Sequence, residues 1–451
     1  MGAADVTTEH FRRLGMPDEA AASRAALMTR VWSGIQAFTG GSAEWSWFVP
    51  GRLEVFGKHT DYAGGRSLVA AVPRGFGVAA RSRDDGVVRV IDVRYGSRTE
   101  IDLRNDGHPL TGWASYVQVV ARRLAHNFPG ATLGVDVAIA SDLPRAAGLS
   151  SSSALVVAIA TALTRRAELP AREEWKSAIA NIHDLAWYLG CVENGLDYRN
   201  LAGTAGVGTH GGSEDHTAIL ASRVGCLSQY RFMPVAHEGD VAMPSDWAFV
   251  IASSGVHADK AGSVREHYNR ASLGTRALLA CWNAVAAEPA HSLAAALERV
   301  GAVETLRELV TRRPPEGYDD AALVRRLSHF IAEDARVPRA ARAFAESDAA
   351  TIAALARDSQ READEWLGNQ VEETRVLAAA AEHAGAIAAS SFGAGFGGSV
   401  WALVPSGDAE VFAVTWLAEY TRRCRTASAT SLEWFVARPG PPLTEVPLAG
   451  A

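Results

Sequence analysis

The stretch "PGRLEVFGKHTDYAGG", residues 50–65, places charged and hydrogen-bonding side chains between glycines that allow sharp turns. A segment that only reverses the chain does not need this density of functional groups. His59 and Asp61 provide donors and acceptors on a short arc, as a polyhydroxyl ligand requires. The fixed charge of Arg52 suits a transferring phosphoryl group. We therefore interpret residues 50–65 as a ligand-binding loop.

The same loop permits a structural interpretation. Glu54 and Asp61 could neutralise Arg52 and Lys58 as ion pairs, which are common at surfaces and contribute little stability. This explains any single pair better than it explains the whole cluster. Lys58 is also an unusual choice, because the chain contains only three lysines.

A second segment, "LPRAAGLSSSSA" at residues 143–154, combines a glycine, four serines and the start of an apolar run typical of a helix. The first N–H groups of a helix have no intrahelical partners and bind anions well, and serine hydroxyls add donors. The serines could instead serve only as helix caps, but one serine is enough for a cap. The pattern favours phosphate binding. The Walker loop is absent, since "GRLEVFGKH" has the wrong spacing and lacks the final Ser or Thr.

Two further segments carry weaker patterns. "SSFGAGFGG", residues 390–398, precedes a strand-like run, so the dinucleotide fingerprint does not apply, and the glycines indicate either a structural turn or a ligand loop. "GGSED", residues 211–215, places a carboxylate after a Gly-Gly turn, where it could act as a base at a pocket wall. The nearby histidines match no common zinc spacing.

The bulk composition bounds the class of protein. A length of 451 residues suits two domains or one bilobal unit, and 48% hydrophobic with 21% charged residues is ordinary for a globular chain. The net charge of -7 argues against nucleic-acid binding. We see no signal peptide, no membrane-spanning run and no CxxC pair, so we expect a cytoplasmic protein with reduced thiols and no membrane partner.

Hydrophobic periodicity indicates mixed helix and strand. We expect helices over residues 17–38 and 113–124, strands over 87–93 and 133–139, and a strand that runs into a loop over 247–260. Because the pattern lacks strict βαβ alternation, it favours the α+β class. We place a domain boundary near Gly239, which gives domains at residues 1–238 and 239–451.

Taken in order, the segments at residues 50–65, 143–154 and 390–398 resemble the three motifs of the GHMP small-molecule kinases, and most closely those of the galactokinases. The resemblance covers most of residues 48–405. It implies a bilobal fold of two mixed α/β domains with the active site in the cleft between them. It also implies ATP-dependent, Mg²⁺-dependent phosphorylation of the anomeric hydroxyl of a monosaccharide, galactose or a close relative. Oligomeric state and adenine contacts cannot be read from the sequence.

Carried over residue by residue, the resemblance implies that Arg52 and Asp215 form the catalytic pair. Asp215 would take, or electrostatically assist the loss of, the sugar's hydroxyl proton, while Arg52 would stabilise the alkoxide and the developing phosphate charge. The implied substrate-binding residues are Lys58, His59, Asp61 and Tyr268. The implied ATP-phosphate-binding residues are Gly148, Leu149, Ser150, Ser151, Ser152 and Ser153. The implied metal ligands are Ser152 and Glu193, and the implied cleft glycines are Gly393, Gly395, Gly397 and Gly398.

The chain departs from the galactokinase pattern at several positions. Lys58 stands where galactokinases usually carry a Glu that contacts the sugar, so Lys58 could accommodate an acidic sugar such as a uronic acid. "GGSED" replaces a "GIMDQ"-like stretch, and the segment between Glu193 and Asp215 is longer than usual. Two other readings remain: a catalytically silent sugar sensor, disfavoured by the intact motifs, and a kinase for a non-sugar alcohol, disfavoured by the "HTDY" loop.

Overall fold

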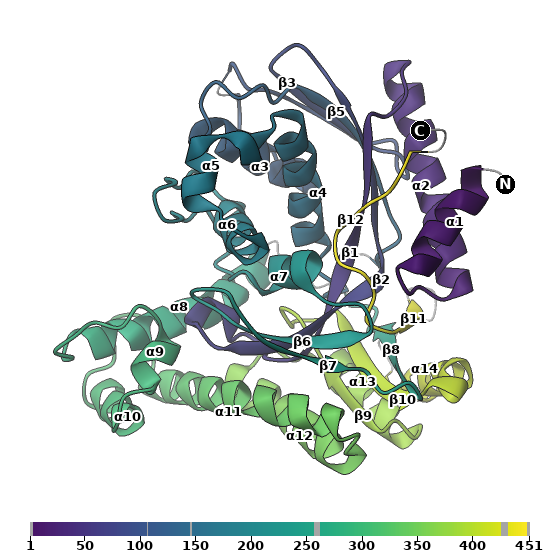
Figure 1. The fold of residues 1–451 in the computed structure, drawn as a ribbon. Helices are drawn as coiled ribbons and strands as arrows, with labels where there is room; N and C mark the ends of the chain where they lie inside the picture. Colours follow the sequence, from purple (N-terminus) through teal and green to yellow (C-terminus); the bar gives the residue numbers. More distant parts are fainter. Residues whose placement is uncertain (1–2, 106, 145–146, 257–261, 425–431, 449–451) are drawn as a thin grey trace.

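The computed structural model of the chain describes residues 3–105, 107–144, 147–256, 262–424 and 432–448. It contains two separate β-sheets with helices packed against both, in a bilobal arrangement (Figure 1). This architecture confirms the expected α+β class.

The larger sheet has eight strands. Its path runs β12-β1-β2-β5-β3-β4, and β6 and β7 extend it from the start of β2. The strands are β1 (Trp45–Phe56), β2 (Arg66–Ser82), β3 (Val87–Asp92), β4 (Arg98–Asp102), β5 (Val135–Ser141), β6 (Cys226–Arg231), β7 (Ala236–Ala242) and β12 (Thr444–Glu445). Only β3 and β5 pair in parallel; the other pairings are antiparallel among the described strands.

Helices cover both faces of the larger sheet. Figure 1 shows α3 to α6 beside one face and α1 and α2 beside the other. Successive side chains of β1 alternate accordingly: Phe48 packs in the cluster that includes α2, whereas Trp47 and Val49 pack in the main core. The bounds of the first helices are α1 (Ala3–Arg13), α2 (Asp18–Thr39), α3 (Trp113–Asn127), α4 (Ser151–Arg166), α5 (Glu173–Ala178), α6 (Ile182–Asn194) and α7 (Glu214–Ala221).

The smaller sheet is antiparallel, in the order β11-β8-β10-β9. Its strands are β8 (Trp247–Ser253), β9 (Ala388–Ser391), β10 (Ser399–Pro405) and β11 (Trp434–Ala437). The helices around it and below the larger sheet are α8 (Gly262–Asn283), α9 (Leu293–Leu297), α10 (Ala302–Arg312), α11 (Asp320–Ala345), α12 (Ala349–Glu362), α13 (Glu372–His383) and α14 (Ala409–Arg423).

One hydrophobic core joins the two sheets. The buried ring of Trp401 on β10 makes edge contacts with Phe56 at the end of β1 and with Phe249 on β8, at centroid distances of 6.0 and 5.6 Å. Because these residues belong to both sheets, the lobes share their packing and are fixed against each other.

The expected division into residues 1–238 and 239–451 stays a prediction, but the strand pairing bears on where it can fall. A division between residues 238 and 239 would cut β7, which pairs with β6 through Gly239. The change from one sheet to the other falls between β7 and β8, and β12 returns from the far end of the chain to the first sheet. Composition gave no sign of this, because the hairpin β6–β7 is short and its second strand is largely exposed.

The local elements mostly follow the sequence patterns. The helices expected over residues 17–38 and 113–124 are α2 and α3, and the expected strands are β3, β5 and β8. Residues 50–65 were expected to be a loop throughout, but the first half is strand: Arg52 lies within β1, and the chain turns only from Gly57.

Helix α11 fixes the turn that follows β1. The Glu333 carboxylate accepts the backbone N–H groups of Gly57 and Lys58 at 2.9 and 3.2 Å. One helical position later, Asp334 accepts the backbone N–H of Arg66 at 2.7 Å and its guanidinium at 2.9 Å. A helix from the second half of the chain thus holds both ends of the turn at residues 57–66.

Lys58 takes part in this anchoring. Its side chain is only 1% exposed, and its ammonium donates to the hydroxyls of Ser359 and Ser390 at 2.7 and 2.6 Å. Glu333, itself paired with Arg336, is a nearby counter-charge. Burial lowers the pKa of Lys58 to about 8, although Glu333 acts in the opposite direction.

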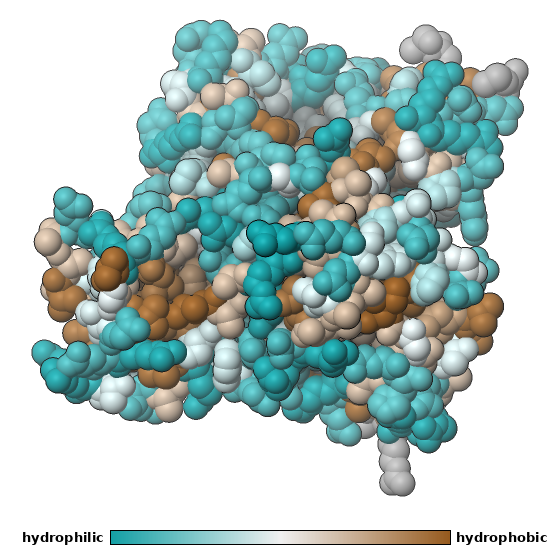
Figure 2. Space-filling model, turned by 60° about the horizontal axis from the view of Figure 1, so that its bottom comes forward, coloured by the Kyte–Doolittle hydropathy of each residue, from teal (hydrophilic) through white to brown (hydrophobic). Residues whose placement is uncertain are grey.

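The outer surface is mostly hydrophilic in the view of Figure 2, with an apolar area on the left, the side where α8 to α10 lie in Figure 1. Val285 and Val300, between α8 and α10, are among the exposed large hydrophobic residues. None of the helices in the described residues is long and apolar enough to span a bilayer.

Replacing Lys58 with Met should change how stability depends on pH. The folded pKa of Lys58, about 8, lies below the ordinary 10.5, so between these values the unfolded chain binds more protons and the free energy of unfolding rises with pH. As pH rises from about 7 to about 10, wild type should gain up to about 3 kcal/mol relative to Lys58→Met. Urea unfolding curves measure this difference. Lys176→Met, at an exposed lysine paired with Glu173, is the control, and a constant difference over this range would contradict the prediction.

Candidate functional site

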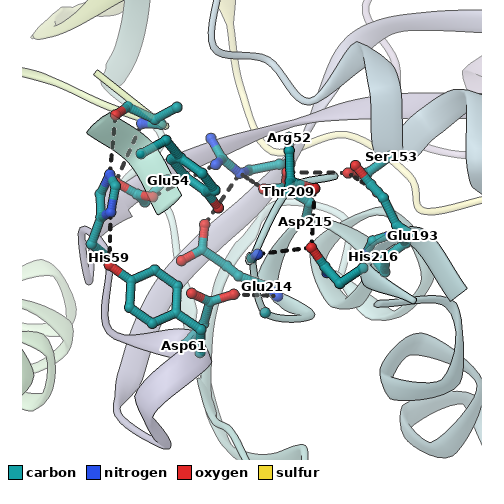
Figure 3. Close-up of a pocket in the computed structure, with 17 residues that line it drawn as sticks. Arg52, Glu54, His59, Asp61, Ser153, Glu193, Thr209, Glu214, Asp215 and His216 are labelled. Carbon is teal, nitrogen blue, oxygen red and sulfur yellow. Dashed lines mark hydrogen bonds and ion pairs between the residues drawn. The ribbon is translucent and has the colours of Figure 1, made fainter. Parts of the chain in front are cut away.

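A pocket lies where the turn after β1, the start of α7, α8 and the loop after β9 meet (Figure 3). Most of its lining groups are polar. The lining residues are Arg52, Glu54, His59, Asp61, Tyr62, Ser153, Glu193, Asn194, Thr209, Gly211, Gly212, Glu214, Asp215, His216, Tyr268, Gly393 and Ala394.

Arg52 is the central cation of this pocket. Its side chain is 5% exposed, and its Nε donates to Asp215 Oδ1 at 2.7 Å while Nη1 donates to the Gly148 carbonyl at 3.0 Å. Burial lowers its pKa, but nearby carboxylates, Asp215 first, outweigh this effect and raise the pKa of Arg52 above its ordinary value. The guanidinium is therefore permanently charged and fixed in direction.

Asp215 is held from two sides at the start of α7. Its second oxygen, Oδ2, accepts the Ser153 hydroxyl at 3.2 Å, and the same hydroxyl contacts Glu193 Oε2 at 2.9 Å (Figure 3). His216 Nε2 lies 3.0 Å from that Glu193 oxygen. The structure thus brings together two of the sequence-predicted carboxylates, from α6 and α7, around one serine of α4.

A larger cleft adjoins the pocket and contains the serine-rich helix start. Gly148, Ser150, Ser151 and Ser152 line this cleft, and α4 begins at Ser151. Both Arg52 and Asp215 line the cleft as well as the pocket. The catalytic pair expected from the sequence therefore stands at the junction of the two cavities.

The serine run divides between the two cavities. Consecutive helical residues point about 100° apart, so Ser152 faces the cleft and Ser153 faces the pocket. Ser153, expected among the phosphate-binding residues, contacts Glu193 and Asp215 instead. Leu149 is buried, and its carbonyl accepts the backbone N–H of Arg52 at 3.2 Å.

The glycine segments of the second and third motifs pack backbone against backbone. A Cβ on Gly393 would lie 3.0 Å from the Gly148 carbonyl oxygen, and a Cβ on Gly148 would lie 3.1 Å from the Phe392 carbonyl oxygen. Both glycines have positive φ, 73° and 78°. Of the expected cleft glycines, Gly393 lines the pocket, whereas Gly395 packs against Asn369 and Gly397 against Val256. Gly398 donates its N–H to the Val256 carbonyl.

The far wall of the pocket contains three of the expected substrate-binding residues. Asp61 accepts the backbone N–H of Glu214 at 3.1 Å. The pKa of Asp61 is raised, mainly because the carboxyl group is buried. The rings of His59 and Tyr268 lie 5.3 Å apart. A Cβ on Gly212 would fall 2.2 Å from Asp61 Oδ2, which explains the Gly-Gly pair before α7.

Lys58 does not line the pocket, which contradicts the expectation that it binds substrate. Its ammonium donates hydrogen bonds to Ser359 on α12 and Ser390 on β9. The chain turns at Gly57, and the Glu333 carboxylate holds this turn by accepting the Gly57 N–H. The proposed acidic-sugar specificity depended on Lys58 and loses its basis.

Two carboxyl groups of the pocket were not assigned a role from the sequence. Glu54 and Glu214 both lie near the Arg52 guanidinium, at 3.6 and 3.2 Å. Burial, followed by the charge of Glu54, raises the pKa of Glu214 well above its usual range. Burial also raises the pKa of Glu54, against the opposing charge of Arg52. Alternation along β1 was the available signal, because Arg52 and Glu54 are two residues apart and face the same side.

Comparisons with known proteins identify the family of the chain. The chain matches the galactokinase galactose-binding signature over residues 36–82, the N-terminal domain of GHMP kinases over 115–186 and their C-terminal domain over 340–421. A galactokinase of Streptomyces coelicolor is 30% identical over 83% of this chain and 88% of its own length. A galactokinase of Chloroflexus aggregans is 29% identical over 83% of this chain and 87% of its own.

Solved structures show the same fold. Lactococcus lactis galactokinase, solved in complex with galactose, superposes with a TM-score of 0.72 at 22% identity, over 92% of this chain and 98% of that one. L. major mevalonate kinase is more distant, with a TM-score of 0.53 and 14% identity over 87% of this chain and 96% of that one. From the similarity to the Streptomyces coelicolor enzyme over most of both chains, and from the three family signatures in order, the chain belongs to the galactokinase family of GHMP kinases and is a sugar kinase.

Proposed function

We propose that this chain transfers the γ-phosphoryl group of ATP to the anomeric hydroxyl of a neutral monosaccharide, with galactose as the substrate. The observation that carries the proposal is the contact between Arg52 and Asp215 at the junction of the polar pocket and the serine-lined cleft. The sugar would occupy the pocket, and the ATP phosphates would lie in the cleft at the start of α4.

In this arrangement Asp215 receives the proton of the attacking hydroxyl. Its two oxygens accept hydrogen bonds from Arg52 and Ser153. These bonds hold the carboxylate in one orientation. Arg52 then lies beside the developing alkoxide and the transferring phosphoryl group, where a fixed positive charge lowers the barrier most. The protein supplies positioning and charge, which are the main requirements of phosphoryl transfer.

Oxygen donors suited to Mg²⁺ line both the pocket and the cleft. Carboxylate and hydroxyl oxygens are the ligands Mg²⁺ prefers, and it commonly takes one or two from protein while retaining water and substrate phosphates. Glu193 would be the carboxylate ligand and Ser152, in the cleft, the hydroxyl ligand. Bound Mg²⁺ would neutralise charge on the phosphates. Ser153 would orient Glu193 through its 2.9 Å contact.

The pocket's charge favours a neutral sugar over a uronic acid. Glu54, Asp61 and Asp215 all line it, and Arg52 is already shared among Asp215, Glu214 and Glu54. A substrate carboxylate would enter a site with more acidic than basic groups, where Arg52 is the only arginine or lysine among the lining residues that the structure describes.

A substrate panel tests the proposed reaction. With Mg-ATP, galactose should yield a sugar 1-phosphate detectable by ³¹P NMR, and galacturonate should react at least about 100-fold more slowly, because like charges disfavour its binding. Fucose and glucose, which are neutral, are the matched comparisons. Absence of product from every neutral hexose would refute the sugar-kinase assignment, and faster reaction with galacturonate would refute the charge argument.

Asp215→Asn should abolish most turnover without unfolding the protein. The amide keeps the shape of the side chain but cannot accept the proton, so kcat should fall by about 10²- to 10⁴-fold. Steady-state kinetics measures this loss, and calorimetry should still detect galactose binding. Asp364→Asn, at an exposed residue paired with Arg375, is the matched control. Wild-type kcat in Asp215→Asn would remove Asp215 from the mechanism.

A further inference from the structure

We propose that Arg326 of α11 is a positioning residue for the sugar pocket, acting through a hydrogen-bonded chain from Arg326 to Tyr62, His59 and the Ala394 carbonyl. This chain fixes His59 as the tautomer protonated on Nε2 and ties the loop after β9 to the pocket wall. Its kinetic consequence rests on the proposed function, whereas its geometry does not.

The direction of each hydrogen bond follows from the chemistry of its two ends. Arg326 Nη2 lies 3.0 Å from the Tyr62 hydroxyl and can only donate. The Tyr62 hydroxyl therefore accepts from Arg326 and directs its own proton to His59 Nδ1, 2.8 Å away. At the other end, the Ala394 carbonyl, 3.1 Å from His59 Nε2, can only accept. The Ala394 end requires the proton on Nε2, and in the neutral ring Nδ1 then accepts the Tyr62 proton.

Other contacts hold the Arg326 guanidinium in a fixed orientation. Its Nε donates to the Ala271 carbonyl of α8 at 3.1 Å, and Nη1 lies 3.1 Å from His329 Nδ1. Nη2 also donates to the backbone carbonyl of His59 at 2.6 Å. The planar fork of an arginine is needed for this set of directions, and a lysine ammonium cannot reproduce it.

The backbone at His59 shows why such support is needed. His59 has φ of 58°, a left-handed conformation that is uncommon for a residue other than glycine. The Arg326 bond to the His59 carbonyl stabilises this conformation, and the ring packs 5.3 Å from Tyr268 of α8. Arg326 thus binds the turn after β1 and α8 at the same point.

His59 lines the pocket, and its ring forms part of the pocket wall (Figure 3). Its ring nitrogens contact the Tyr62 hydroxyl and the Ala394 carbonyl, so His59 ties the loop after β9 to that wall. Its expected contact with the substrate stays a prediction. Arg326 contacts protein groups behind this wall, so its effect on the reaction is indirect.

Imidazole NMR tests the tautomer on the full-length protein without substrate. In ¹⁵N-histidine-labelled protein, long-range ¹H–¹⁵N correlations separate the two neutral tautomers, and His59→Gln identifies the His59 signal among 13 histidines. We expect His59 protonated on Nε2 in wild type and a shifted Nδ1 resonance in Tyr62→Phe, which removes the donor. Tyr420→Phe, which removes a buried hydroxyl bonded to the Ser254 carbonyl at 2.7 Å, should leave the signal unchanged. A wild-type His59 protonated on Nδ1 would overturn the proposal.

Kinetics and calorimetry then test the positioning role. Arg326→Met should raise the KM and the calorimetric Kd for galactose about tenfold, the scale of one lost hydrogen bond, while the KM for ATP changes less than about twofold. Arg326→Lys should recover only part of the loss. Unchanged galactose affinity in a folded Arg326→Met would overturn the proposal, and if that variant does not fold, the Tyr62→Phe spectrum decides. Because the NMR and calorimetric results need no turnover, failure of the sugar-kinase assay in wild type would be recognised separately.

Discussion

The guanidinium of Arg52 connects all three motifs of the chain. It donates hydrogen bonds to Asp215 at the start of α7 and to the Gly148 carbonyl in the second motif. Gly148 in turn lies against Gly393 of the third motif with no room for a side chain. Because three segments far apart in the sequence depend on one buried cation, its counter-charges must be placed within the protein rather than supplied by solvent.

The surrounding carboxyl groups answer that requirement. Asp215, Glu214 and Glu54 all face Arg52, and burial raises the pKa of Glu54 and of Glu214, which favours their uncharged forms. The site therefore keeps a fixed cation beside the Asp215 carboxyl group, the combination that proton removal and phosphoryl transfer both use. Substrate selection and charge balance arise from the same group of side chains.

The sequence predicted those features that depend on local pattern and failed where distant segments decide the outcome. Strand and helix periodicity located β3, β5 and α3, and the motif resemblance placed Arg52 beside Asp215. The direction of Lys58 could not be predicted, because it depends on Glu333, 275 residues away, capturing the backbone at that point. Likewise, the division of Ser152 and Ser153 between two cavities depends on where α4 begins, a boundary that sequence patterns fix poorly.

The last strand of the larger sheet has a consequence for synthesis on the ribosome. β12 pairs with Trp47 and Phe48 of β1, Val446 accepts the Ser46 hydroxyl at 2.7 Å, and Gly440 bonds the Ala71 carbonyl. Until residues 440–446 leave the exit tunnel, the edge of β1 has no partner, and an unpaired edge is a template for intermolecular association. The first lobe can pair β1 with β2 early, but the contacts of β1 with residues 444–446 form only after almost the entire described chain has been synthesised.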